Sequence, residues 1–171
     1  MLKTRKLRDA NVYVNGTTTH GQSTEITLPD ISPEKSEYKA LGMTGTLKLF
    51  NGFAAMEAAI KWSAPDNDIL KAFLNPMKAV ELMIRSSVDV YENGSLSDQE
   101  PIIFYLKGTP SNCNNGTLKS KEDTETETQI DITYVKIVQN GTTLVELDIA
   151  NNIFYVDGED LLAQYRENLG L

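Results

Sequence analysis

Few residues in this chain are of the types that carry out nucleophilic or metal-dependent chemistry. His20 is the only histidine and Cys113 the only cysteine among 171 residues. A hydrolytic triad needs a base beside its nucleophile, and a zinc site needs about four ligands, commonly cysteine and histidine. We expect His20 in a surface turn, and Cys113 in a loop where no neighbouring cation lowers the thiol pKa. The chain is therefore expected not to be an enzyme and to hold no zinc.

Carboxylates and glycines also fail to form a recognisable site. Glu122, Asp123, Glu125 and Glu127 are neighbours in a polar segment, where no apolar pocket would raise a carboxyl pKa for acid catalysis. The segment 42–45, Gly-Met-Thr-Gly, precedes a strand-like run, whereas a phosphate-binding loop precedes a helix. The sequence thus predicts no catalytic residue, no metal ligand and no cofactor.

The charge is uneven along the chain. The net charge is −8, yet Lys3, Arg5, Lys6 and Arg8 make the segment 1–10 a basic N-terminal arm. Such an acidic body repels phosphate, which argues against a conventional nucleic-acid-binding protein. The arm either contacts an acidic neighbour or stays a solvated terminus. No apolar run reaches the roughly 18 residues that span a bilayer, and no secretory signal is recognisable, so we expect expression in a cytosol.

Turn signals and alternating patterns dominate the rest of the chain. Asn-Gly occurs five times, at Asn15, Asn51, Asn93, Asn115 and Asn140, and both residues tolerate the positive φ of a type I′ hairpin turn. Asn93-Gly94 and Asn140-Gly141 each lie between strand-like runs and are predicted hairpin turns. Strands are predicted over residues 12–14, 24–28, 45–50, 56–62, 80–91, 102–106, 130–138 and 143–149.

Two helices and one polar segment interrupt this pattern. Ser63 and Asp66 resemble a capping box before an apolar face that ends at Asn75-Pro76. A C-terminal helix is predicted over residues 157–170, with Gly170 as its stop. Residues 110–128 are polar: the first half is expected to be a loop and the second to begin a strand. The predicted fold is one mainly β domain, 1–171: an antiparallel sandwich or barrel with two short helices and long hairpins, 80–106 and 126–149.

Several blocks, taken together, resemble one known family. Residues 25–45 contain Thr-Leu-Pro, then Ser-Glu-Tyr, then Gly-Met before a strand, and residues 51–58 form the next block. The best match lies in residues 134–148, in Val-Asp-Gly at 156–158, and in the final Asn-Leu-Gly-Leu at 168–171. In this order and spacing the chain resembles the major tail tube proteins of contractile-tailed phages, and also the tube proteins of R-type pyocins.

The resemblance implies a structural subunit of the inner tube of a phage tail. Six subunits would form a ring, long hairpins would join a barrel around a channel, and stacked rings would deliver the genome without binding DNA specifically. It also implies a tail sheath protein, a baseplate or initiator and a tail terminator as partners, in a virion tail assembled in the bacterial cytoplasm. We expect inter-subunit or inter-ring contacts in the loop 34–46, at Tyr38, Leu41, Gly42 and Met43.

Two alternatives stay open at the sequence level. A tube protein of a bacteriocin or a type VI-like injection device would share the architecture and differ in cargo and partners. A soluble β-sandwich binding module belongs to a different class, and it would use the Asn-Gly loops as a binding rim. The chain shows no cluster of aromatic residues suited to such a rim.

Overall fold

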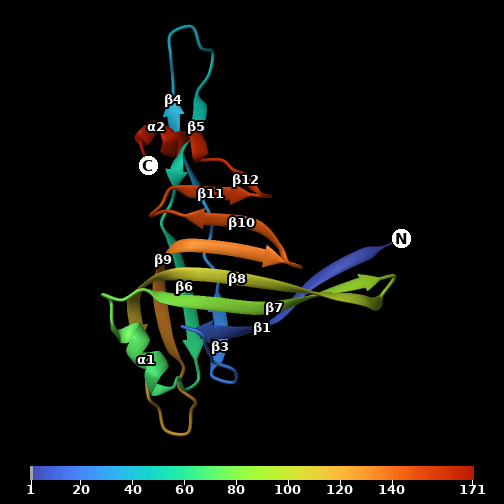
Figure 1. Ribbon diagram of the computed structural model, residues 1–171. Coiled ribbons are helices and arrows are strands. Elements are labelled where there is room, and N and C mark those ends of the chain that lie inside the picture. The colour runs from blue at the N-terminus through green and yellow to red at the C-terminus, as the bar shows by residue number, and fades with distance from the viewer. Residues whose placement is uncertain (1) are drawn as a thin grey trace.

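The fold is dominated by one large antiparallel sheet (Figure 1). The structure is a computed structural model that describes residues 2–171. These residues form the strands β1 (Lys3–Val14), β2 (Thr17–Thr18), β3 (Ser23–Thr27), β4 (Pro33–Tyr38), β5 (Leu47–Phe53), β6 (Met56–Trp62), β7 (Val80–Glu92), β8 (Ser95–Asn114), β9 (Thr126–Gln139), β10 (Thr142–Asp148), β11 (Ile153–Val156) and β12 (Glu159–Asp160), and the helices α1 (Asn67–Leu74) and α2 (Ala163–Leu169). The mainly β, antiparallel fold class predicted from the sequence is confirmed.

The strand β9 organises the sheet because it has two different partners on one side. The strand order is β12-β11-β10-β9-β8-β7-β1-β2, and β9 additionally pairs with β6, which pairs with β3. The first half of β9, up to Ile132, pairs with β6, and the second half, from Tyr134, pairs with β10. The sheet is therefore folded across β9, and the core lies inside this fold.

The core is apolar and closed at one end by α1. Trp62 and Ile130 are completely buried, and α1 contributes Ile69 and Phe73. The rings of Trp62 and Phe73 lie 5.8 Å apart, and Trp62 Nε1 donates a hydrogen bond of 2.9 Å to the buried Thr128 Oγ1. Each such buried apolar side chain contributes roughly 2 kcal/mol to stability.

The Asn-Gly turns are confirmed where strand-like runs flank them. In Asn15-Gly16, Asn93-Gly94 and Asn140-Gly141 both residues have positive φ, as a type I′ turn requires. The other two pairs are different. Asn51-Gly52 lies inside β5, where the pairing with β4 is irregular, and the Asn115-Gly116 pair belongs to the loop between β8 and β9.

The basic arm is a strand, which corrects the prediction that β structure begins at Val12. β1 begins at Lys3 and pairs with β7 as far as Glu92. The acidic neighbour is in the same chain: Lys3 Nζ lies 3.8 Å from a Glu92 carboxylate oxygen, and Arg5 forms an ion pair with Glu100 of β8. Composition alone made this segment look like a solvated terminus.

β8 is also longer than predicted. It runs from Ser95 to Asn114, although the apolar pattern marked only residues 102–106. A two-residue turn at Asn93-Gly94 forces the following residues to pair at once with β7, whatever their polarity. The polar segment 110–128 therefore divides differently from expected: its first residues finish β8, a loop follows, and β9 begins at Thr126.

Both helices begin later than predicted. The N-cap of α1 is Asp66, because Ser63 is held outside the helix by hydrogen bonds to the Gln22 carbonyl oxygen. α2 covers Ala163–Leu169 rather than 157–170, since Asp157 and Gly158 have the positive φ of a turn between β11 and β12. Gly170 ends α2 in the left-handed conformation, as predicted.

Candidate assembly surfaces

The two residues first considered for chemistry lie on different parts of the fold. His20 is exposed in the turn after β2, and Cys113 is half-buried near the end of β8. Burial raises the pKa of the Cys113 thiol, which keeps it protonated and a poor nucleophile. Within residues 2–171 no group of three or more His, Cys, Asp or Glu side chains is placed to hold a metal ion. The same part of the chain contains no helix that is long and apolar enough to span a membrane.

A three-stranded ribbon projects from the body of the sheet (Figure 1). It consists of residues 3–8 of β1, 87–92 of β7 and 95–101 of β8. β9 pairs with β8 only from Ile102 onward, and β2 pairs with β1 only at Tyr13 and Val14. Within the described chain, both outer edges of the ribbon therefore lack a partner strand. Unpaired strand edges are sites at which another chain can add.

The edges of the ribbon carry opposite charges. The β1 edge holds four cations and no carboxylate from Lys3 to Arg8, while the β8 edge holds Asp98 and Glu100. Asp98 is exposed, and its carboxylate accepts a hydrogen bond of 2.8 Å from the backbone N–H of the next residue. Arg5 and Glu100 already pair with each other across the ribbon, so the exposed Lys6 on one edge and the exposed Asp98 on the other are the charges left for a second copy.

Buried side chains on both faces of β7 fix the conformation of the ribbon. Asp89 of β7 is completely buried and accepts a hydrogen bond of 2.8 Å from Gln99 Nε2, with Arg8 Nη1 at 3.4 Å. A buried carboxylate is tolerated only when it is paired in this way. Val88 and Val90, on the opposite face of β7, are also buried. Because both faces of its central strand are covered, the ribbon holds its edges in a fixed direction.

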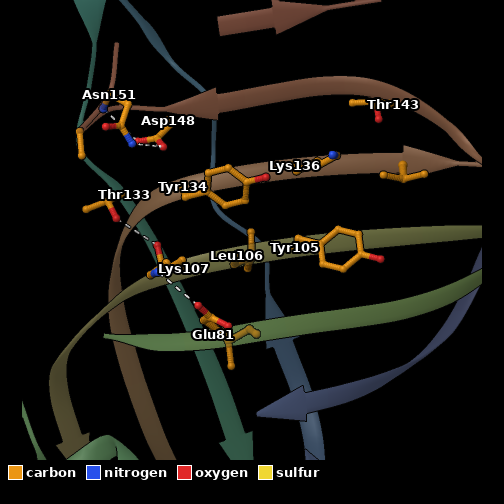
Figure 2. Close-up of a pocket in the computed structure, with 13 residues that line it drawn as sticks. Glu81, Tyr105, Leu106, Lys107, Thr133, Tyr134, Lys136, Thr143, Asp148 and Asn151 are labelled. Carbon is orange, nitrogen blue, oxygen red and sulfur yellow. Dashed lines mark hydrogen bonds and ion pairs between the residues drawn. The ribbon is translucent and has the colours of Figure 1, made fainter. Parts of the chain in front are cut away.

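The face of the sheet that is turned away from the core is polar and ion-paired (Figure 2). Glu81 on β7 pairs with Lys107 on β8 at 3.2 Å, and Lys136 on β9 pairs with Glu146 on β10 at 3.6 Å. Tyr134 donates a hydrogen bond of 2.8 Å to Glu146, and burial together with this carboxylate raises the pKa of the phenol. Glu81, Lys107, Tyr134 and Lys136 line a depression of about 750 Å³. Its positive and negative side chains pair with one another, so the depression presents neither an unpaired base nor a group of cations that could bind an anion.

The hairpin of β4 and β5 projects from one end of the molecule (Figure 1). All six residues of β4 are exposed, and the first five of β5 are too. A two-stranded hairpin with both faces in water is marginally stable by itself.

A family model described as phage tail tube protein FII matches residues 4–170, nearly the whole chain. The chain belongs to the phage tail tube protein FII family. The family predicted from the sequence is thereby confirmed, and the protein is a structural component of a virion tail.

Two curated relatives are similar to this tail tube protein along all or most of their length. The tail tube protein of Escherichia phage P2 is 29% identical over 175 residues, which cover 100% of both chains. The major tail tube protein of Serratia phage KSP20 is 26% identical over 159 residues, covering 92% of this chain and 90% of its own.

Solved structures of contractile machines share the fold. A chain from the sheath/tube terminator of the extracellular contractile injection system PVC has a TM-score of 0.58 at 12% identity, covering 75% of this chain and 92% of its own. A chain from the PVC sheath-tube complex has a TM-score of 0.57 at 11% identity, covering 75% of this chain and 87% of its own. A chain from the anti-feeding prophage baseplate has a TM-score of 0.54 at 13% identity, covering 75% of this chain and 90% of its own.

Within this tail tube fold, the residues predicted for contacts lie together at the end of the β4–β5 hairpin. Tyr38 is the last residue of β4, and Leu41, Gly42 and Met43 follow in the turn. Leu41 is fully exposed at 106% of its reference area, and Gly42 has a φ of 85°. The residues predicted for hairpin turns lie elsewhere: Asn93-Gly94 at the tip of the ribbon, and Asn140-Gly141 between β9 and β10.

The sequence reasoning missed the ribbon edges. The signal was present: basic residues at positions 3, 5, 6 and 8 match acidic residues at 98 and 100. Each set looked like a solvated segment when it was considered alone. Their relation became visible only when β7 placed them on the two sides of one ribbon.

Proposed function

We propose that this tail tube protein closes into homohexameric rings, which stack into a hollow tube for genome delivery. The observation that supports it best is the ribbon, whose basic β1 edge and acidic β8 edge are both open. In a ring each subunit presents two different surfaces to its two neighbours, as this ribbon does. The β8 edge of one subunit would lie beside the β1 edge of the next.

The direction of this junction follows from the strand order. β1 and β8 are each antiparallel to β7, so they run in the same direction within a subunit. A rotation about the ring axis preserves that relation, so the strands meeting between subunits are parallel. The polar face of the sheet is the side that faces the channel in this arrangement. Its paired charges, with a net chain charge of −8, suit a wall along which DNA passes without specific binding.

The partners of the assembled tube follow from the same proposal. The fold relatives come from a sheath-tube complex, a tube terminator and a baseplate. We propose that the assembled tube is surrounded by a tail sheath protein, that it starts on a baseplate or initiator, and that a terminator closes its other end. The contacts between rings involve Tyr38, Leu41, Gly42 and Met43 on the β4–β5 hairpin, because this hairpin projects beyond the body.

Negative-stain electron microscopy of the purified protein at high concentration tests the proposal. Hollow rings with six subunits, or tubes built from them, are the expected result. A monodisperse monomer, even when a tail initiator complex is supplied as a nucleus, would contradict the assignment. A ring with another number of subunits would contradict the hexameric state but not the tube function.

Charge reversal at one ribbon edge should weaken ring closure. Asp98→Lys places a cation opposite the Lys3–Arg8 edge of the neighbour, and an exposed pair of this kind changes each contact by about 1 kcal/mol. The protein concentration needed for tubes is expected to rise about fivefold at low salt, and less at high salt. Light scattering across a concentration series measures this.

Asp30→Lys is the matched control, because Asp30 is exposed and lies outside the ribbon, between β3 and β4. It makes the same change in net charge. If the two variants shift the assembly concentration equally, net charge and not the β8 edge is responsible, and the edge-to-edge contact is wrong.

A further inference from the structure

Three hairpin turns of this chain have the same backbone, at Asn15-Gly16, Asn93-Gly94 and Asn140-Gly141. The three asparagines have φ of 48°, 50° and 47°, and the three glycines have φ of 83°, 84° and 79°. In each turn the asparagine backbone N–H donates to a carbonyl oxygen of the neighbouring segment: Asn15 to Glu81 at 2.8 Å, Asn93 to Leu2 at 3.0 Å and Asn140 to Pro101 at 2.9 Å. A difference in reactivity between these asparagines must therefore come from their side chains.

The side chains differ because the neighbouring residue returns a hydrogen bond in only two of the turns. The Glu81 backbone N–H donates to Asn15 Oδ1 at 2.9 Å. The Leu2 backbone N–H donates to Asn93 Oδ1 at 3.3 Å in the same manner. Each of these bonds fixes a side-chain amide against the neighbouring segment and restricts its rotation.

Pro101 cannot return such a bond, because proline has no backbone N–H. The Asn140 side chain is exposed, and within residues 2–171 it has no hydrogen-bond partner. There is space around the turn, since a Cβ added to Gly141 would meet no atom within 4 Å, as in the other two turns. The Asn140 amide is therefore free to rotate where the equivalent amides are held.

This freedom matters in an Asn-Gly pair, because glycine has no side chain to shield its backbone nitrogen. A side-chain amide that reaches the nitrogen can cyclise with it. The two remaining Asn-Gly pairs are restrained at that step. The Gly116 N–H donates to Asn114 Oδ1 at 2.9 Å, and Asn51-Gly52 lies inside β5, between residues that pair with β4. Asn140 is thus the least restrained of the five asparagines.

We propose that Asn140 is a site of spontaneous deamidation, and that Pro101 makes it more reactive than the equivalent turns. The Gly141 backbone nitrogen attacks Asn140 Cγ and forms a C–N bond. The side-chain amide group leaves as ammonia, carrying the proton that the glycine nitrogen loses, and a cyclic imide remains. Water then adds to one imide carbonyl and opens the ring to aspartate or isoaspartate. Water is the only other reactant.

The products change the turn beside β8, where the ribbon joins the sheet (Figure 1). Gln139 Nε2 donates to a Glu100 carboxylate oxygen at 3.1 Å next to this turn. Aspartate at position 140 places a further negative charge near that carboxylate. Isoaspartate adds a methylene group to the backbone of a loop whose geometry fits two residues. Converted subunits should therefore unfold at a lower temperature than the parent protein.

Peptide mass spectrometry of the purified protein tests the assignment. The protein is kept in mildly alkaline buffer, dilute enough that subunits stay unassembled. Peptides that contain each asparagine are followed over days for the mass gained when a carboxylate replaces an amide. Asn140 is expected to convert about fivefold faster than Asn15 or Asn93, which is the effect of one hydrogen bond on a rate.

Pro101→Ala tests the cause, because it restores a backbone N–H opposite Asn140. The rate at Asn140 should fall about fivefold, to the rate of Asn15, while Asn15 and Asn93 are unaffected. Pro76→Ala is the matched control, since Pro76 is exposed and follows the end of α1. It should leave all three rates unchanged. Circular dichroism establishes that each variant is folded.

Two results would overturn the proposal. Conversion of any of the other four asparagines at the rate of Asn140, or before it, would remove Asn140 as the preferred site. An unchanged rate in folded Pro101→Ala protein would remove the role of the missing N–H. If Pro101→Ala does not fold, the comparison of the five asparagines in the parent protein still decides. None of these results depends on whether the subunit forms tubes.

Discussion

Leu41→Asp combined with Met43→Asp should give folded protein that no longer forms tubes. Leu41 and Met43 lie in the turn of the β4–β5 hairpin, outside the apolar core, so the free energy of unfolding should change by less than about 0.5 kcal/mol. Two carboxylates at each hairpin tip would be buried without partners in a contact between rings. Breaking a contact by burying an unpaired charge costs about 3 kcal/mol or more. Size-exclusion chromatography and negative-stain microscopy measure assembly, and thermal unfolding measures the fold.

The exchange Leu41→Met with Met43→Leu is the matched control. It keeps the apolar character of the tip and introduces no charge, so tubes should form at close to the normal concentration. Normal tubes from the double aspartate variant would show that the hairpin tip is not part of the inter-ring contact. Rings without tubes would be the most informative outcome, because they would separate ring closure through the ribbon from stacking through the hairpin.

The sequence predicted those elements in which local chemistry decides the structure. The strand over residues 56–62 and the Asn93-Gly94 and Asn140-Gly141 turns are found where they were expected. In these cases the residue types alone determine the structure, either through alternating apolar positions or through a turn that requires positive φ. The whole-chain resemblance to tail tube proteins rested on such local blocks, and the family model confirms it.

Elements that depend on a distant partner were missed or shortened. Lys3 and Arg5 pair with carboxylates about ninety residues away, so no window around them shows a strand. Asp157-Gly158 belongs to a turn that only the pairing of β11 with β12 makes necessary, and the sequence pattern favoured a helix there. The candidate contact residues of the hairpin came from the resemblance, and their role stays a prediction that the aspartate variants test.

At Gly108 the backbones of β8 and β9 approach too closely for any side chain. Gly108 lies in β8 opposite the point where β9 changes partner: Ile132 still pairs with β6, and Tyr134 already pairs with β10. Between them Thr133 is an extra residue, since Lys107 faces Tyr134 and Gly108 faces Ile132. The Thr133 carbonyl oxygen accepts a bond of 3.0 Å from the Ile149 backbone N–H. A glycine within a strand pattern often signals this kind of close backbone approach, so the sequence contained the hint.

Gly108→Ala should therefore destabilise the subunit strongly. A Cβ at this position would lie 2.0 Å from the Asp131 carbonyl oxygen and 2.8 Å from its carbonyl carbon, both backbone atoms that cannot rotate away. β8 and β9 must separate to admit the methyl group, which breaks ladder hydrogen bonds where the sheet folds. We expect a loss of about 3 kcal/mol in the free energy of unfolding, which is a fall of roughly 6 to 12 °C in Tm for a chain of this size. Calorimetry or circular dichroism of the unassembled subunit measures it.

Gly45→Ala supplies the comparison, because Gly45 has no positive φ and a methyl group added to it would have no atom within 4 Å. Its Tm should stay within about 2 °C of the parent protein. An unchanged Tm for Gly108→Ala would mean that β8 and β9 separate without cost, and the fold across β9 would then not depend on this contact.

A large fall in Tm would also lower tube yield, since β8 carries the acidic edge of the ribbon on the same strand. Tube yield should recover on cooling, which the hairpin aspartate variants should not show, because their subunits are folded at every temperature tested.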